Sequence, residues 1–112
     1  MSFVRPVSWV KAARKDFESF PLDVQKRALF ALSIAAAGGK ADIVKPLKGF
    51  GTGVMEIVIK SRGDAFRVVY AVQIGDDLWV LHAFQKKSTD GIKTPKRHID
   101  IIHERIKHIR DL

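Results

Sequence analysis

The spacing of apolar residues predicts two consecutive helices in the first third of the chain. One face of the first helix is formed by residues that recur at i, i+3, i+7 and i+10, namely Val10, Ala13, Phe17 and Phe20. Ser8 stands just before this run and is a predicted N-cap. Pro21 ends the first helix and opens the second, because proline is tolerated in a first turn. Residues 8–38 therefore predict a helical hairpin.

The second predicted helix runs from Pro21 to the glycine pair at 38–39, which is typical of a C-terminal cap. Asp23 lies near its N-terminus, where a carboxylate suits the helix dipole. The predicted buried stripe consists of Leu22, Leu29, Leu32 and Ala36, with Phe30 and Ile34 alongside. We expect this stripe to face the core.

After residue 53 the apolar period changes from that of a helix to that of a strand. Residues 54–60 alternate, with Met55, Ile57 and Ile59 on one face and Val54, Glu56, Val58 and Lys60 on the other. Residues 66–74 and 78–85 are two further strands, apolar on both faces, and short turns make the three an antiparallel meander. Residues 4–7, which include a proline, predict a short edge strand. The glycine-rich residues 45–53 predict a loop.

The end of the chain predicts one more helix, from about residue 95 to 110. Thr94 is its predicted cap and Pro95 its first residue. Its apolar stripe recurs at i, i+3, i+7 and i+10 and consists of Ile99, Ile102, Ile106 and Ile109. The polar residues 88–93 before it predict an exposed loop. The order of elements indicates one α+β domain over residues 1–112, a small antiparallel sheet with an N-terminal helical hairpin and a C-terminal amphipathic helix.

Composition narrows the possible classes of protein. The chain has 112 residues, 46% of them apolar and none a cysteine, which excludes disulfides, thiolate nucleophiles and cysteine-based zinc sites. Residues 1–10 do not have the pattern of a signal peptide. The longest apolar run, residues 28–37, is shorter than the roughly 20 residues that a membrane span needs. We expect a cytoplasmic protein with no membrane partner.

The net charge of +8 points to an anionic partner. The excess of Lys and Arg lies in residues 1–40 and 86–112, whereas residues 41–85 are balanced. This distribution favours nucleic acid or an acidic protein as the partner. The alternative is a basic domain that binds nothing.

Several kinds of catalytic site are not supported by the sequence. His98, His103 and His108 follow one another at spacings of five, so they do not share a helical face as a metal-binding pair would. The glycines of residues 49–53 lead into a strand, whereas a phosphate-cradling loop leads into a helix. Glu56 is the one acidic residue within a predicted strand and has no evident second carboxylate. We expect no metal and no cofactor.

The remaining candidates for chemistry are cations. Arg67 lies on a strand among apolar residues, as either a paired structural ion or a clamp for an anion such as phosphate. Lys86 and Lys87 follow where the next strand leaves the sheet. A second group is expected to bind nucleic acid or to form only a solvated rim: Lys48, Lys60, Arg62, Lys93, Lys96 and Arg97. Spacing alone leaves open whether Arg67 and Lys86 cluster.

Aromatic and imidazole side chains give weaker candidates. His82 lies within an apolar strand, which favours a hydrogen-bonded core residue over a catalyst. Trp9 and Phe50 have rings that stack on bases in some proteins, but core positions explain them better.

Several motifs together resemble the RelE/HigB superfamily of type II toxin–antitoxin toxins, in its phage-derived HigB-like branch. They are Lys45-Pro46-Leu47-Lys48-Gly49-Phe50-Gly51, Val54-Met55-Glu56-Ile57, Phe66-Arg67-Val68-Val69-Tyr70, Val80-Leu81-His82-Ala83-Phe84-Gln85-Lys86-Lys87-Ser88 and Thr94-Pro95-Lys96. The resemblance covers residues 4–110. It implies a RelE-like fold and a ribosome-dependent endoribonuclease that cuts mRNA and is held inactive by an antitoxin, often a helix-turn-helix protein.

The resemblance also implies roles for individual residues. Arg67 would contact the scissile phosphate, and Lys86 or Lys87 would stabilise charge on the leaving side, because attack by the 2′-hydroxyl of RNA needs in-line geometry and charge stabilisation. A general base is not evident; a lysine with a lowered pKa is one option, and His82 is the second. The family often has a basic residue where this chain has Val58, so either Lys60 or Arg62 takes over that charge or catalysis is weakened.

Two other functions stay open at this stage. Relatives of the ParE type use a similar scaffold to poison DNA gyrase without cutting RNA, and a non-catalytic nucleic-acid-binding module would show the same charge. The nuclease hypothesis depends on Arg67 reaching the RNA backbone. An Arg67 side chain locked to an internal carboxylate and sealed from solvent would contradict it.

Overall fold

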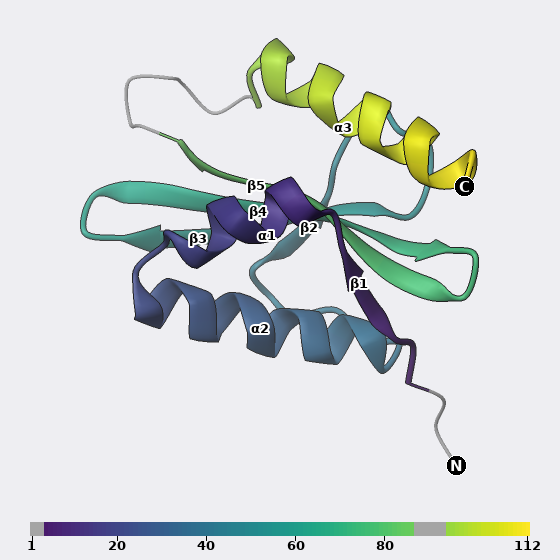
Figure 1. Cartoon of the computed structure of the whole chain (residues 1–112). Coiled ribbons are helices and arrows are strands. Elements are labelled where there is room, and N and C mark those ends of the chain that lie inside the picture. Colours follow the sequence, from purple (N-terminus) through teal and green to yellow (C-terminus); the bar gives the residue numbers. More distant parts are fainter. Residues whose placement is uncertain (1–3, 87–93) are drawn as a thin grey trace.

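A five-stranded sheet forms the middle layer of the molecule, with helices on both of its faces (Figure 1). The structure is a computed structural model that describes residues 4–86 and 94–112. The strands are β1 (Val7–Trp9), β2 (Val44–Pro46), β3 (Val54–Ser61), β4 (Asp64–Ile74) and β5 (Asp77–Lys86), in the spatial order β1-β5-β4-β3-β2. β1 runs parallel to β5, and the other neighbours are antiparallel.

The helices α1 (Lys11–Glu18) and α2 (Leu22–Ala36) cover one face of the sheet, and α3 (Lys96–Arg110) covers the other. Figure 1 shows α2 and α3 on opposite sides of the strands. We call these sides the α1/α2 face and the α3 face. The expected α+β class, with two N-terminal helices, a mostly antiparallel sheet and a C-terminal helix, is confirmed.

Two apolar cores follow directly from the alternation along the strands. On β3, Ile57 and Ile59 point to the α1/α2 face, where they join Phe17, Leu32 and other side chains of the two helices. Val54, two positions before the buried Glu56, points to the α3 face. There the core contains Val69, Leu81 and Phe84 from β4 and β5 and the predicted stripe of α3: Ile102, Ile106 and Ile109, with Ile99 partly buried. The central strands are covered on both sides, which explains why residues 66–74 and 78–85 are apolar on both faces.

A tight hairpin between β3 and β4 fixes the register of these two strands. Ser61 pairs with Asp64, so only Arg62 and Gly63 form the loop, and both have positive φ values, 53° and 84°. Two consecutive residues with positive φ define a type I′ turn, whose twist matches that of the flanking strands. The register sets which side chains of β3 and β4 lie opposite each other on the α3 face.

Several local predictions need correction. The first strand lies at 7–9 and not at 4–7; Ser8 belongs to it and bonds to Asp77, so Val10 takes the N-cap position of α1. Pro95, and not Thr94, stands at the N-cap of α3. Residues 45 and 46, the start of the expected loop 45–53, belong to β2 in the structure; the proline and the three-residue length of β2 hide its strand pattern.

The predicted stripe of α2 is also partly wrong. The helix buries Val24, Ala28, Ala31, Leu32, Ala35 and Ala36, whereas Leu22, Leu29 and Phe30 are exposed at 73%, 49% and 68%. Because α2 has apolar residues around most of its circumference, periodicity alone did not identify the side that faces the sheet.

None of the helices within the described residues is both long enough and apolar enough to cross a lipid bilayer.

Candidate nucleic-acid interface and buried polar network

The α3 face contains the buried polar and charged side chains of the described residues. These are Glu56, Arg67, His82 and Lys86, with exposed fractions of 0%, 6%, 4% and 3%. Strand alternation explains their common side, since each lies two positions from an apolar residue of the α3-face core: Val54, Val69 or Phe84. A buried charge is costly unless it is paired and hydrogen-bonded. The buried polar groups of this face therefore need hydrogen-bond or charge partners within the protein, and we call them and those partners the polar network.

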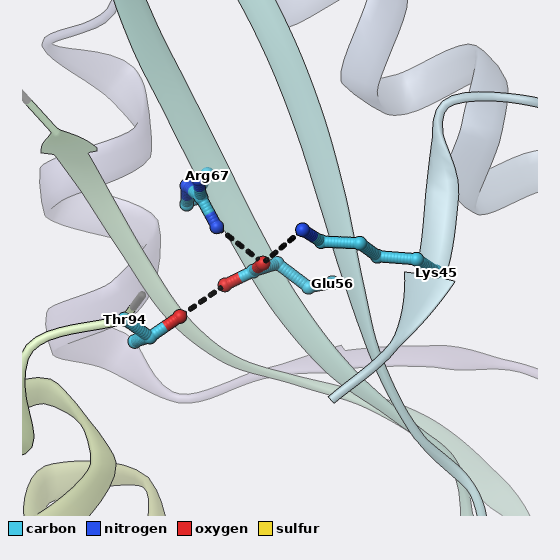
Figure 2. Close-up of polar contacts among 4 residues, drawn as sticks. All are labelled: Lys45, Glu56, Arg67 and Thr94. Atoms are coloured by element: carbon cyan, nitrogen blue, oxygen red, sulfur yellow. Dashed lines mark hydrogen bonds and ion pairs between the residues drawn. The ribbon is translucent and has the colours of Figure 1, made fainter. Parts of the chain in front are cut away.

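Glu56 is the centre of that network (Figure 2). Arg67 donates from Nη1 to Oε1 of Glu56 at 2.6 Å, and Thr94 donates from Oγ1 to Oε2 at 3.0 Å. Lys45, whose side chain is 56% exposed, brings its Nζ to 4.0 Å from Oε1. The carboxylate thus joins β3 to β4, to the start of α3 and to β2. The Nε of Arg67 is buried and has no hydrogen-bond partner among the described residues.

The geometry of Arg67 contradicts its predicted role as an open phosphate clamp. Its side chain is only 8% exposed and its guanidinium is neutralised by Glu56. A phosphate group would have to displace the carboxylate and enter the space beneath α3 to reach it. The other interpretation left open by the sequence, a paired structural ion, describes this structure.

His82 forms a second polar chain with Arg105 and His98. Nη1 of Arg105 lies 2.8 Å from the Leu81 carbonyl oxygen and 2.9 Å from Nδ1 of His82. Because arginine has only donors, Nδ1 of His82 must be the accepting nitrogen and its proton must lie on Nε2. That Nε2–H then donates to Nδ1 of His98 at 2.7 Å. The direction of all these hydrogen bonds is fixed by the arginine.

This arrangement argues against His82 as the general base. Burial, then the nearby charge of Arg105 and then His98 lower the pKa of His82 to about 3. Both of its ring nitrogens are occupied by protein partners. A base must accept a proton from substrate at a reachable nitrogen, so we interpret His82 as a structural residue that orients His98.

The ring of His98 also stacks on Phe84, with centroids 3.9 Å apart, and lines a cleft of about 530 Å³ at the edge of β5. Asp16 and Asp64 contribute carboxylates to the same cleft. Because these carboxylates repel phosphate, the cleft is poorly suited to an RNA backbone.

Strand register answers the question of whether the basic residues cluster. Lys60 pairs with Ala65, and Ala65 pairs with Lys86, so the two lysines lie in one row on the α3 face. Arg67 lies in the next row on the same face, opposite Phe84. Positions diagonal to each other across antiparallel strands are about 7–8 Å apart. Arg67 and Lys86 are therefore neighbours, while Lys60 is the exposed member of the group.

Comparison with known proteins places this geometry in a family. A model of a family described as phage-derived protein Gp49-like (DUF891) matches residues 15–107. The chain belongs to this family. Among curated proteins, none matches the sequence.

Two solved structures are similar to this Gp49-like chain. A mutant of the E. coli toxin RelE in the free state aligns with a TM-score of 0.63 at 16% identity, over 95% of this chain and 98% of that one. The toxin–antitoxin complex RelBE2 from Mycobacterium tuberculosis aligns with a TM-score of 0.50 at 17% identity, over 74% and 92%. The fold of the Gp49-like chain is that of RelE-like toxins, as the sequence motifs implied.

The other predicted nucleic-acid-binding residues of this Gp49-like chain lie on several different elements. Lys48, Arg62, Lys96 and Arg97 are exposed, and Arg62 lies at the tip of the β3–β4 turn. Lys96 lies 4.0 Å from Asp100, a solvated pair within α3. Lys87 and Lys93 lie outside the described residues. Trp9 packs on Phe17 and Phe50 on His103, so both rings have protein partners.

Sequence reasoning missed three members of the polar network: Lys45, Thr94 as a ligand of Glu56, and Arg105. The sequence did carry a signal for the pairing of Glu56 with Arg67. Both residues fall on inward positions of consecutive strands, where an acid and a base neutralise each other. Nothing in the sequence pairs Arg105 with His82. Among residues 4–86 and 94–112, no three His, Asp or Glu side chains lie together as a metal site requires.

Proposed function

We propose that this chain is the toxin of a type II toxin–antitoxin pair and that it cleaves mRNA on the ribosome without a metal ion. Membership of the Gp49-like family, the RelE-like fold and the net charge of +8 support the proposal. RelE itself is named a toxin, and RelBE2 a toxin–antitoxin complex. The site of action in this proposal is the end of the α3 face that carries Lys60 and Lys86.

The row formed by Lys60 and Lys86 is the observation that favours this site. Lys60 and Lys86 lie on the same face of the sheet, on either side of the small residue Ala65. RNA cleavage by its own 2′-hydroxyl places extra negative charge on the phosphate and on the leaving oxygen, and fixed cations stabilise both. Lys60 contacts the backbone in this proposal, and the charge of Lys86 or Lys87 supports the leaving side. Lys86, at 3% exposed, acts there through its charge and not by contact.

The form of the nuclease hypothesis that required Arg67 to reach the RNA backbone fails, because Arg67 is bonded to Glu56 and its side chain is only 8% exposed. The present proposal relies on Lys60 and Lys86 instead, and gives Arg67 a different role. Arg67 holds Glu56 in place, and Glu56 in turn fixes Thr94 at the entry to α3. Arg67 is thus a positioning residue for the surface that RNA meets.

The test is ribosome-coupled cleavage of mRNA by the purified chain in EDTA. We expect cleavage by the wild type and a loss of about tenfold or more for Lys60→Ala, because one fixed charge on the phosphate is removed. Lys15→Ala, at another exposed lysine, which lies on α1, is the matched control and keeps full activity. Intact mRNA with the wild-type protein contradicts the nuclease proposal.

The burial of Arg67, His82 and Lys86 favours a second candidate, a toxin that acts by binding alone, as gyrase-inhibiting relatives do. None of these three is exposed enough to touch a substrate as it stands. This candidate predicts arrested DNA replication or gyrase-dependent DNA breaks with mRNA left uncut.

A further inference from the structure

The outer surface of α2 is apolar at positions where a helix on the outside of a small protein is normally polar. Leu22, Leu29 and Phe30 are exposed at 73%, 49% and 68%, on the side of α2 that does not face the sheet. From residue 22 to residue 30 the helix rises about 12 Å, at 1.5 Å per residue. Three large apolar side chains exposed on one helix make its outer surface a candidate site of interaction.

A groove lies beside this surface. It measures about 360 Å³ and lies between α2 and the segment that leads into β2. Its apolar lining comes from Phe30 and Ala31 of α2 and from Ala41 and Ile43. Lys26 and Arg27 stand on the helix side, and Asp42 is the one acidic residue of the lining. We call these lining residues the α2 groove; Leu22 and Leu29 lie on the same helix outside its lining.

We propose that the α2 groove docks an amphipathic helix of an acidic antitoxin, with apolar side chains against Phe30 and Ile43 and carboxylates near Lys26. This inference rests on the proposed function as a toxin. The mode is helix-in-groove recognition, in which two or three turns of a partner helix bury anchors at i, i+3, i+4 and i+7. The length of the exposed stripe matches two turns.

Charge decides between this partner and a second copy of the chain. A two-fold contact through the α2 groove would bring Lys26 and Arg27 of one copy against those of the other. Both copies also carry a net charge of +8. The negative charge of an acidic partner is opposite both to Lys26 and Arg27 and to the net charge of this chain. This attraction speeds association and orients the partner.

Charge and lining also disfavour RNA as the occupant. A single-stranded RNA site combines a basic groove with several flat rings on which bases stack. Among the residues that line the α2 groove, Phe30 is the one aromatic side chain, and the rest of its apolar lining is aliphatic. The groove also lies on the opposite side of the sheet from Lys60 and Lys86, so an antitoxin bound there leaves the α3 face uncovered.

The experiment begins by identifying the antitoxin as the neighbouring gene product whose co-expression restores growth to cells that express this chain. Its affinity is then measured for the full-length wild type, Phe30→Glu, Lys26→Glu and Leu112→Glu. We expect Phe30→Glu to weaken binding by at least about tenfold, as for a central apolar anchor, and Lys26→Glu to weaken it and reduce its salt dependence. Leu112, exposed at 83% away from α2, is the matched control and Leu112→Glu leaves affinity unchanged.

The outcomes separate this inference from the function on which it rests. Unchanged antitoxin affinity in Phe30→Glu overturns the α2 groove and leaves the toxin proposal intact. A shift in the monomer–dimer equilibrium or in RNA affinity, with antitoxin binding preserved, overturns it as well. Absence of any growth defect on expression contradicts the toxin proposal itself. Phe30 and Lys26 are exposed, so thermal unfolding of both variants should match the wild type.

Discussion

The two faces of the sheet bury different kinds of side chain although they share the same strands. On the α1/α2 face, Ile57, Val68, Tyr70 and Val80 pack against apolar side chains of two helices. On the α3 face, the same strands present Glu56, Arg67, His82 and Lys86 beneath a single helix. Folding alone requires only the first arrangement, because apolar packing stabilises a sheet without the desolvation cost of charges.

The buried charges of the α3 face are not explained by stability alone. A buried ion pair is often no more stabilising than well-packed apolar residues of similar volume. Within the described residues, the buried ion pair lies on the α3 face, close to the row of Lys60 and Lys86. If burial of charge distinguishes the α3 face, substitutions there should change the free energy of unfolding more than substitutions on the α1/α2 face.

The largest expected effect comes from removing only one of the two charges of the Glu56–Arg67 ion pair. Glu56→Gln keeps the shape of the side chain but leaves the buried Arg67 charge without its counter-ion. We expect the free energy of unfolding to fall by about 3–5 kcal/mol, the usual cost of an uncompensated buried charge. Urea denaturation followed by circular dichroism measures it.

Two matched variants sharpen this result. Ile57→Val, the next residue on the opposite face, should cost only about 0.5–1.5 kcal/mol. The double variant Glu56→Leu with Arg67→Met should recover most of the stability lost by Glu56→Gln, because both charges are removed together. A double variant as unstable as the single one would mean that the pair itself stabilises the fold.

The next effect is a dependence of stability on pH that comes from His82. Its pKa is about 3 in the folded chain, against about 6.5 for an unperturbed histidine. Between these values the unfolded state binds a proton that the folded state does not, so stability is retained above pH 6.5 and is lost as the pH falls.

The slope is about 1.4 kcal/mol per pH unit, or somewhat under about 3 kcal/mol between pH 6.5 and 4.5. The measurement is the difference in unfolding free energy between the wild type and His82→Phe at several pH values, which removes the contributions of other groups. A constant difference over this range would show that His82 is readily protonated in the folded state, against the hydrogen bonds that Arg105 and His98 make with it.

The difference between apolar and polar positions also explains which features could be predicted from the sequence. The helices, the meander and the faces of β3 followed from periodicity, because burial of apolar residues sets that period. The fold family followed from motifs spread over most of the chain. Glu56 and Arg67 were placed on strands correctly, but their pairing depends on the register between β3 and β4, which the Arg62-Gly63 turn fixes.

Other features were beyond the sequence for physical reasons. The bond from Arg105 to His82 joins residues 23 positions apart and depends on how α3 lies on the sheet. The exposure of Phe30 depends on the rotation of α2, and a helix with apolar residues around most of its surface does not encode that rotation in its period.

A smaller effect is expected from the exposed lysine of the α3 face. Lys60→Ala should lower the salt dependence of RNA binding, reducing the slope of log affinity against log salt by about 1, because one phosphate of the RNA is no longer neutralised. Lys15→Ala, on the opposite side of the sheet, should leave the slope unchanged. Fluorescence anisotropy with a labelled single-stranded RNA at several salt concentrations measures both, and equal slopes for all three proteins would remove Lys60 from the interface.

The smallest effect is expected from charges that lie on α3 but are solvated. Lys96 and Asp100 form an i, i+4 pair 4.0 Å apart, with side chains exposed at 89% and 62%. Pairs of this kind are worth at most about 0.5 kcal/mol and are screened by salt. Asp100→Asn should therefore change the unfolding free energy by less than about 0.5 kcal/mol, and still less at high salt. A loss comparable to that of Glu56→Gln would mean that charge anywhere on this side of the molecule matters, and that burial does not distinguish the polar network of the α3 face.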